Sequence, residues 1–251
     1  MLRRLLYFGL FVATALGLKA ETAFQPGDHL SYDLYWSFIK VGTAELRFEA
    51  ARLTPDGPDL LHATFTVQTS GIAEKLFKVR DKIESWIDPA TGQPLFYKKK
   101  QREGKTERDI EVHFDWATGS ATYTKNGATF EPQPITDQTR DPLSLIVAIA
   151  STTFKEGESH ALAATDGKRL VYVDVLRQAD QKLNLKAGQF NAQHLEVATN
   201  ELQGVFEKSP DASIELWLSQ ETPALPLKMK SEVAVGSFYG KLREFSVQGY
   251  Q

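Results

Sequence analysis

The sequence contains no cysteine among its 251 residues. Disulfide bonds, thiol catalysis and thiolate metal sites are therefore excluded, and the core alone has to stabilise the fold. Neither a Walker motif nor a G-x-G-x-x-G pattern occurs, so no phosphate-binding loop is recognisable. The G-x-S-x-G sequence of the serine hydrolase nucleophile elbow is missing as well.

Histidine is scarce and scattered. No two of the five histidines lie at the spacing of three to five residues that a local zinc pair needs. Surface or hydrogen-bonded histidines explain this distribution, although a site assembled from distant strands stays open. We expect neither a metal nor another cofactor. The five are His29, His62, His113, His160 and His194.

The chain also has few long hydrophobic runs, and one of them lies near its N-terminus. Arg3 and Arg4 precede an apolar stretch over residues 5–18, which ends near Ala20. A short basic head, an apolar segment and a small residue are typical of a secretory signal peptide. The run is shorter than the roughly 20 residues of a membrane-spanning helix. We predict that residues 1–20 are a cleaved signal peptide, with a retained membrane anchor as the alternative.

Cleavage would leave residues 21–251, which we expect to form a single β-rich domain in the periplasm without a transmembrane span. The remaining chain has 26 basic and 32 acidic residues, a net charge of −6. A nucleic-acid partner is not expected, because such proteins need a basic face.

Most of the mature chain alternates between apolar and polar residues with a period of two. Residues 30–36, 44–50 and 61–69 show this pattern, which is typical of antiparallel strands with one wet face. Turn-forming pairs separate such runs at Asp56-Gly57, Asn126-Gly127 and Asp166-Gly167. The sequence therefore predicts an all-β fold: an antiparallel barrel, half-barrel or sandwich of many short strands, with one or two short helices.

Two segments favour helix. Asp141-Pro142 is a good helix start, since Asp caps backbone amides and Pro suits the first turn. The following residues 143–150 are apolar on nearly all sides, as in a buried helix, although a buried strand stays open. A shorter helix is predicted over residues 71–78. The Pro-containing stretch 131–140 is expected to be a long crossover between two halves of the domain.

Aromatic residues on the predicted strands are candidates for binding a ligand. The set consists of Tyr32, Trp36, Phe114 and Trp116. In a barrel such side chains line a cavity, whereas in a sandwich they fill the core.

A basic run over residues 98–102 is the most unusual local feature. In a strand, Lys98, Lys100 and Arg102 share one face, whereas Lys99 and Gln101 lie on the other. Such a patch suits an anionic partner, but lysines also protect an exposed edge strand from pairing. The acidic residues across the predicted turn, which are Glu103, Glu107 and Asp109, are placed to neutralise it.

Several separated motifs occur in an order that resembles a bacterial exported family, domain of unknown function 3108. They span about residues 23–247 and include Phe24-Gln25-Pro26-Gly27-Asp28, Val41-Gly42, Asp81 with Glu84-Ser85, Asp141-Pro142-Leu143-Ser144, Gly188-Gln189-Phe190, Trp217-Leu218-Ser219, Pro226-Leu227-Lys228 and Val235-Gly236-Ser237. The resemblance implies export but brings no catalytic residues with it. Glycines 27, 42, 188 and 236 are expected at turns or bends where a Cβ would clash.

Three functions follow as hypotheses. The first is a non-enzymatic envelope protein that binds an apolar ligand, such as a lipid, or an envelope protein. The second is a hydrolase acting on envelope glycans or lipids, with carboxylate pairs such as Asp81 with Glu84 or Asp33 with Glu45 as candidates. The third is a purely structural interaction module with an exposed apolar patch.

Overall fold

The computed structural model describes residues 23–198, 213–232 and 236–250. The predicted signal peptide, residues 1–20, lies outside the described residues. The strands and helices in chain order are β1 His29–Trp36, β2 Ile39–Ala51, β3 Leu60–Thr69, α1 Gly71–Leu76, β4 Arg80–Ile87, β5 Pro94–Glu103, β6 Thr106–Asp115, β7 Ser120–Lys125, β8 Ala128–Thr129, β9 Gln133–Pro134, α2 Pro142–Ser151, β10 Ser159–Thr165, β11 Leu170–Arg177, β12 Gln181–Leu185, β13 Gly188–Ala198, β14 Ser213–Ser219, β15 Pro226–Glu232 and β16 Ser237–Ser246.

The strands form one antiparallel sheet in the order β10-β11-β13-β14-β15-β16-β1-β2-β3-β4-β5-β6-β7-β8, with β12 on β13 and β9 on β7. The first and last strands of the domain, β1 and β16, pair with each other and so join two halves of the sheet. The predicted all-β, barrel-like fold with two short helices is confirmed. The segment between β7 and β10 connects the halves, as predicted for residues 131–140, and it contains α2.

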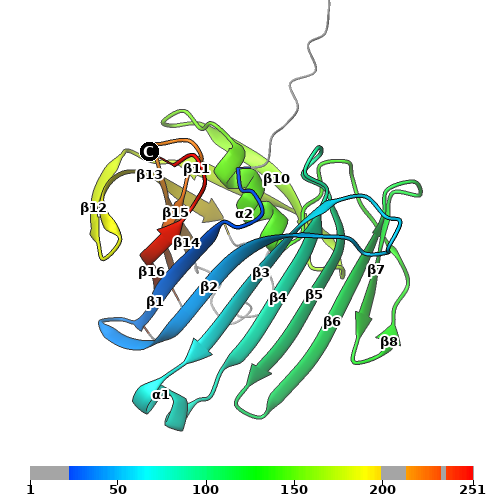
Figure 1. Ribbon diagram of the computed structural model, residues 1–251, viewed down its shortest axis with the longest axis horizontal. Coiled ribbons are helices and arrows are strands. Elements are labelled where there is room, and N and C mark those ends of the chain that lie inside the picture. Colours follow the sequence, from blue (N-terminus) through cyan, green and yellow to red (C-terminus); the bar gives the residue numbers. More distant parts are fainter. Residues whose placement is uncertain (1–22, 199–212, 233–235, 251) are drawn as a thin grey trace, which may run out of the picture.

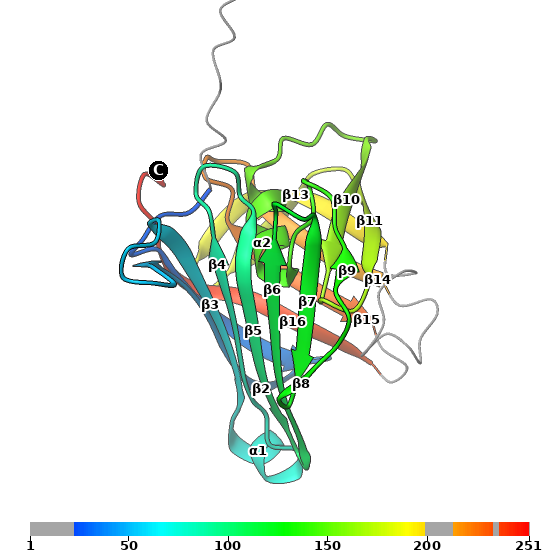
Figure 2. The same ribbon diagram turned by 90° about the vertical axis from the view of Figure 1, so that its right-hand side faces the viewer.

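The sheet curves around α2, which lies on its concave side (Figures 1 and 2). Leu143, Val147 and Ala150 of α2 pack in one core cluster with buried residues of β2 and β3, among them Phe48 and Ala63. The strand alternative for this segment is therefore wrong. An apolar helix is stable here because a strongly curved sheet surrounds it with apolar side chains. The shorter predicted helix is α1, at the opposite end of the strands (Figure 1).

Asp141 fixes where α2 begins. Its carboxylate accepts hydrogen bonds from the backbone N–H groups of Leu143 at 2.7 Å and Ser144 at 3.0 Å. The Ser144 hydroxyl in turn accepts from the Asp141 N–H at 2.9 Å, which completes a capping box. The Ser85 hydroxyl of β4 also donates to the Asp141 carboxylate. The cap therefore ties the helix to the sheet as well as starting it.

Gly42 of β2 lies against the backbone of β3. A Cβ at this position would be 2.1 Å from the carbonyl oxygen of Gln68, a backbone atom that cannot move aside. We therefore expect Gly42→Ala to lower the free energy of unfolding by about 1–3 kcal/mol. Gly240→Ala is the matched control, because its new Cβ would be 3.7 Å from the nearest atom, in Leu34. Urea denaturation measures both, and equal stability of the two variants would contradict the prediction.

Candidate functional site

The helix α2 covers only part of the concave face. Farther along the strands, toward α1, the concave face carries apolar side chains that are exposed or only partly buried, although some of them pack against the core cluster that contains α2, and these we call the open concave face. Opposite residues of an antiparallel pair share a face, so the pairing of the strands identifies its members. They are Leu34 and Trp36 of β1, Val67 of β3, Ile83 of β4, Ile110 of β6, Met229 of β15 and Phe238 of β16.

Several of these side chains are well exposed to solvent. Trp36 and Met229 are both 42% exposed and Phe238 is 46% exposed, whereas Val67 and Ile110 are partly buried. Two of the positions face each other directly, since Trp36 pairs with Phe238 across β1 and β16. The concave side of the sheet therefore combines a filled core around α2 with an apolar surface in contact with water.

Polar groups lie on the same surface beside the apolar residues. Asp81, Lys99 and Gln101 alternate with the outward-facing residues of β4 and β5 and so point to the concave side. Burial raises the pKa of Asp81, and the neighbouring carboxyl of Glu103 adds to that rise. The Asp81 carboxylate also accepts a hydrogen bond of 2.7 Å from the Arg102 N–H. Lys99 pairs with both Ile83 and Ile110, so the polar groups of the open concave face lie among its apolar residues.

The structure separates the four aromatic residues that the sequence singled out. Tyr32 and Phe114 are buried in the core, and the Tyr32 hydroxyl donates to the Pro226 carbonyl at 2.9 Å. Trp116 is partly buried and donates its ring N–H to the Pro94 carbonyl at 2.9 Å. Trp36 alone of the four is part of the open concave face.

The side chains of the basic run on β5 alternate between the two faces as predicted, but β5 is not an edge strand. Lys98 pairs with Glu111 at 2.6 Å, while Arg102 pairs with Asp109 at 2.7 Å. The Glu111 carboxylate raises the pKa of Lys98. Because β5 lies between β4 and β6, the interpretation as edge-strand protection is wrong. The neutralisation expected from Glu107 and Asp109 is confirmed for Arg102, whereas Lys98 is neutralised by Glu111, which the sequence did not single out. Lys100 is the most exposed of the three.

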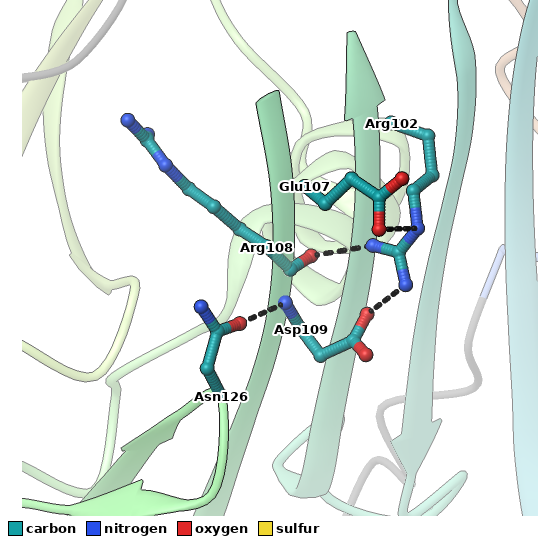
Figure 3. Close-up of a pocket in the computed structure, with 5 residues that line it drawn as sticks. All are labelled: Arg102, Glu107, Arg108, Asp109 and Asn126. Carbon is teal, nitrogen blue, oxygen red and sulfur yellow. Dashed lines mark hydrogen bonds and ion pairs between the residues drawn. The ribbon is translucent and has the colours of Figure 1, made fainter. Parts of the chain in front are cut away.

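A shallow polar pocket of about 350 Å³ lies at this end of β5 and β6. Figure 3 shows the Arg102 guanidinium turned toward the carboxylates of Glu107 and Asp109, while the Arg108 side chain extends away from them. Asp109 also donates its N–H to the Asn126 side-chain oxygen at 2.8 Å. Since the guanidinium is already paired with two carboxylates, this pocket is poorly suited to an anionic ligand.

The structure separates Asp81 from Glu84, one of the carboxylate pairs considered for a hydrolase, whereas Asp33 and Glu45 share the convex face of the neighbouring strands β1 and β2. Asp81 faces the concave side, whereas Glu84 lies on the convex side and contacts Lys82 at 2.7 Å. Asp33 is buried and forms ion pairs of 2.6 Å with both Lys40 and Lys186. Within the part of the chain that the structure describes, no three side chains of His, Asp or Glu are placed to hold a metal ion.

Comparison with known proteins gives a family and a fold. The model of a family described as "Protein of unknown function (DUF3108)" matches residues 31–243. No curated protein matches the chain. No helix among the described residues is both long and apolar enough to span a membrane.

Three solved structures match the chain. A β-barrel-like protein of domain of unknown function DUF1849 from Brucella abortus has a TM-score of 0.58 at 12% identity, over 89% of this chain and 99% of that one. A "putative lipoprotein" from Parabacteroides distasonis has a TM-score of 0.35 at 10% identity, over 90% and 99%. A "putative exported protein" from Bacteroides fragilis has a TM-score of 0.32 at 11% identity, over 89% of this chain and 97% of that one. The first supports the barrel-like fold.

Proposed function

The chain belongs to the DUF3108 family of proteins of unknown function, and from this premise we propose that it is an exported, non-enzymatic envelope protein that binds an apolar ligand such as a lipid. The ligand lies on the open concave face. The single observation that carries the proposal is the exposure of Trp36, Met229 and Phe238 on the concave side of a curved sheet.

Contact with an acyl chain would remove this surface from water. Each buried methylene group contributes about 0.8 kcal/mol, so a chain of several methylenes binds with useful affinity even after the cost of association. The polar groups suit a headgroup, because Asp81 and Lys99 supply a hydrogen-bonding carboxyl and a cation among the apolar residues. Export to the periplasm, predicted from residues 1–20, would bring the protein to a compartment bounded by two membranes.

Native mass spectrometry of the mature chain, residues 21–251, gently purified from a bacterial periplasm, tests this function. We expect a discrete additional mass that disappears under denaturing conditions and has the composition of a lipid. A protein that carries only its own mass, and that binds no added fatty acid or phospholipid, contradicts the proposal.

Hydrolysis of envelope lipids or glycans is the second candidate, and one observation favours it. The adjacent carboxyls of Asp81 and Glu103, with a raised pKa at Asp81, border the same apolar surface. Incubation with a phospholipid distinguishes the two functions. Recovery of the intact lipid supports binding, whereas a cleaved product that is lost in the Asp81→Asn variant supports hydrolysis.

A further inference from the structure

Five large apolar side chains project into water at the end of the sheet farthest from α2. Phe38 and Ile39 lie at the turn from β1 to β2, and Ile72, Leu76 and Phe77 lie in α1 or directly after it. Phe38 is 87% exposed, Ile72 78% and Leu76 82%. We call these five residues the apolar rim, and Figures 1 and 2 show α1 at this end of the molecule.

The apolar rim does not serve the folding of the domain. The helix α1 has no buried residue, yet it carries Ile72 and Leu76 four positions apart and so on one helix face. Exposed apolar residues also concentrate here. Of the eleven large hydrophobic residues that are exposed in the described part of the chain, five form the rim, and two more, Trp36 and Phe238, lie at the same end. Such a concentration marks an interaction surface.

Contacts between three turns hold the rim in place. The Ser70 N–H donates to the Val41 carbonyl at 3.0 Å, which joins α1 to β2. The Gly104 N–H donates to the Lys78 carbonyl at 2.8 Å, which joins α1 to the turn between β5 and β6. The Phe77 ring lies over Gly104 so closely that a Cβ there would come within 2.9 Å of it. These contacts therefore hold the rim in a defined position at this end of the sheet.

Lysines surround the apolar rim. Lys75, Lys78 and Lys105 are exposed, and none of them forms an ion pair within the residues that the structure describes. The acidic residue of α1, Glu74, already pairs with Arg80. These three lysines therefore carry charge that no ion pair neutralises, although Glu103 and Glu107 lie beside the same turn as Lys105 and the whole chain has a net charge of −3.

We propose that the apolar rim docks on the surface of an anionic lipid bilayer. Apolar side chains that protrude separately between lysines match the interfacial region of a bilayer, where apolar groups enter the acyl boundary and lysines meet phosphates. A protein partner would instead favour a surface poor in lysine, because lysine is depleted in protein–protein interfaces. This inference goes beyond the proposed function. Docking in this orientation places Trp36 and Phe238, at the edge of the open concave face, against the bilayer.

Co-sedimentation of the chain 21–251 with vesicles tests the docking. We expect binding to vesicles of phosphatidylglycerol and phosphatidylethanolamine that weakens at high salt, and little binding to phosphatidylcholine alone. The double variant Phe38→Ser/Leu76→Ser is expected to bind at least tenfold more weakly, and so is Lys75→Glu/Lys78→Glu/Lys105→Glu. The matched control is Leu53→Ser/Tyr172→Ser, which removes exposed apolar residues elsewhere and is expected to bind like the unmodified chain.

A labelled cysteine reports the orientation, because the chain has no cysteine of its own. An environment-sensitive dye at Ser70→Cys is expected to shift to the blue with vesicles, whereas the same dye at Asp56→Cys, in the turn between β2 and β3, is not. Absence of vesicle binding, or rim variants that bind as well as the unmodified chain, would overturn the docking. Binding of a water-soluble fatty acid is measured in the same rim variants. If they still bind the fatty acid, the outcome of the docking test is independent of the proposed ligand-binding function.

Discussion

Replacement of Asp141 by alanine is expected to lower the free energy of unfolding by about 3 kcal/mol, combining the loss of a helix cap with newly unpaired buried groups. The carboxylate is fully buried and accepts hydrogen bonds from Leu143, Ser144 and Ser85. Without it, two N–H groups of the first turn of α2 and one hydroxyl of β4 lose their acceptor away from water. The loss is large because a domain has only about 5–15 kcal/mol of stability in total.

Guanidinium denaturation of residues 21–251, followed by tryptophan fluorescence, measures the effect. Asp115→Ala is the matched control. Its carboxylate also accepts from two backbone N–H groups, of Ala117 and Thr118, but in an exposed turn. Water replaces the lost acceptor there, and the control should lose less than about 1 kcal/mol. Similar losses in both variants would show that the buried cap does not hold α2 to the sheet.

The same carboxyl should make stability depend on pH. Burial raises the pKa of Asp141 from 3.8 to about 6 in the folded protein. The folded state therefore binds the proton more tightly than the unfolded state, and this group contributes stability that is fully present below about pH 4 and is lost as the pH rises through about 6. Asp141→Asn keeps an oxygen acceptor without a charge. We expect its difference in stability from the unmodified chain to change between pH 4 and 6, and a constant difference would contradict the assignment.

Local patterns predicted much of the fold. The period of two over residues 30–36 and 44–50 corresponds to β1 and β2, and the Asn126-Gly127 and Asp166-Gly167 pairs lie between consecutive antiparallel strands. The cap at Asp141 located α2 to within a residue. These features depend on neighbours in the chain, so a single sequence contains the information needed to recognise them.

The candidate site depends on long-range packing, and here the sequence was a poorer guide. Tyr32 and Trp36 have the same place in the alternation of β1, yet one is in the core and the other is exposed. The difference arises because α2 covers one end of the concave face and leaves the other open. Met229 and Phe238 were missed for the same reason. The position of β5 in the middle of the sheet could not be predicted either, because the residue pattern of one strand does not say which strands pair with it.

The double variant Val67→Glu/Met229→Glu is expected to weaken fatty acid binding about a hundredfold, which corresponds to about 2.7 kcal/mol. The two residues lie on β3 and β15, on either side of β1, and both face the concave side. Binding of an acyl chain would remove water from each glutamate, and the desolvation of an unpaired carboxylate costs a large free energy. Binding of the naturally fluorescent parinaric acid measures the change directly.

Folding should survive this substitution, which makes the loss of binding interpretable. Met229 is 42% exposed, and Val67 is only partly buried although it packs against the core cluster that contains α2, so neither carboxylate would be fully buried. The control Leu53→Glu/Tyr172→Glu adds the same charge at exposed apolar positions away from the concave face and should bind parinaric acid normally. Equal affinity of both variants would place the ligand elsewhere. Because neither Val67 nor Met229 belongs to the apolar rim, vesicle docking should persist in the Val67→Glu/Met229→Glu variant.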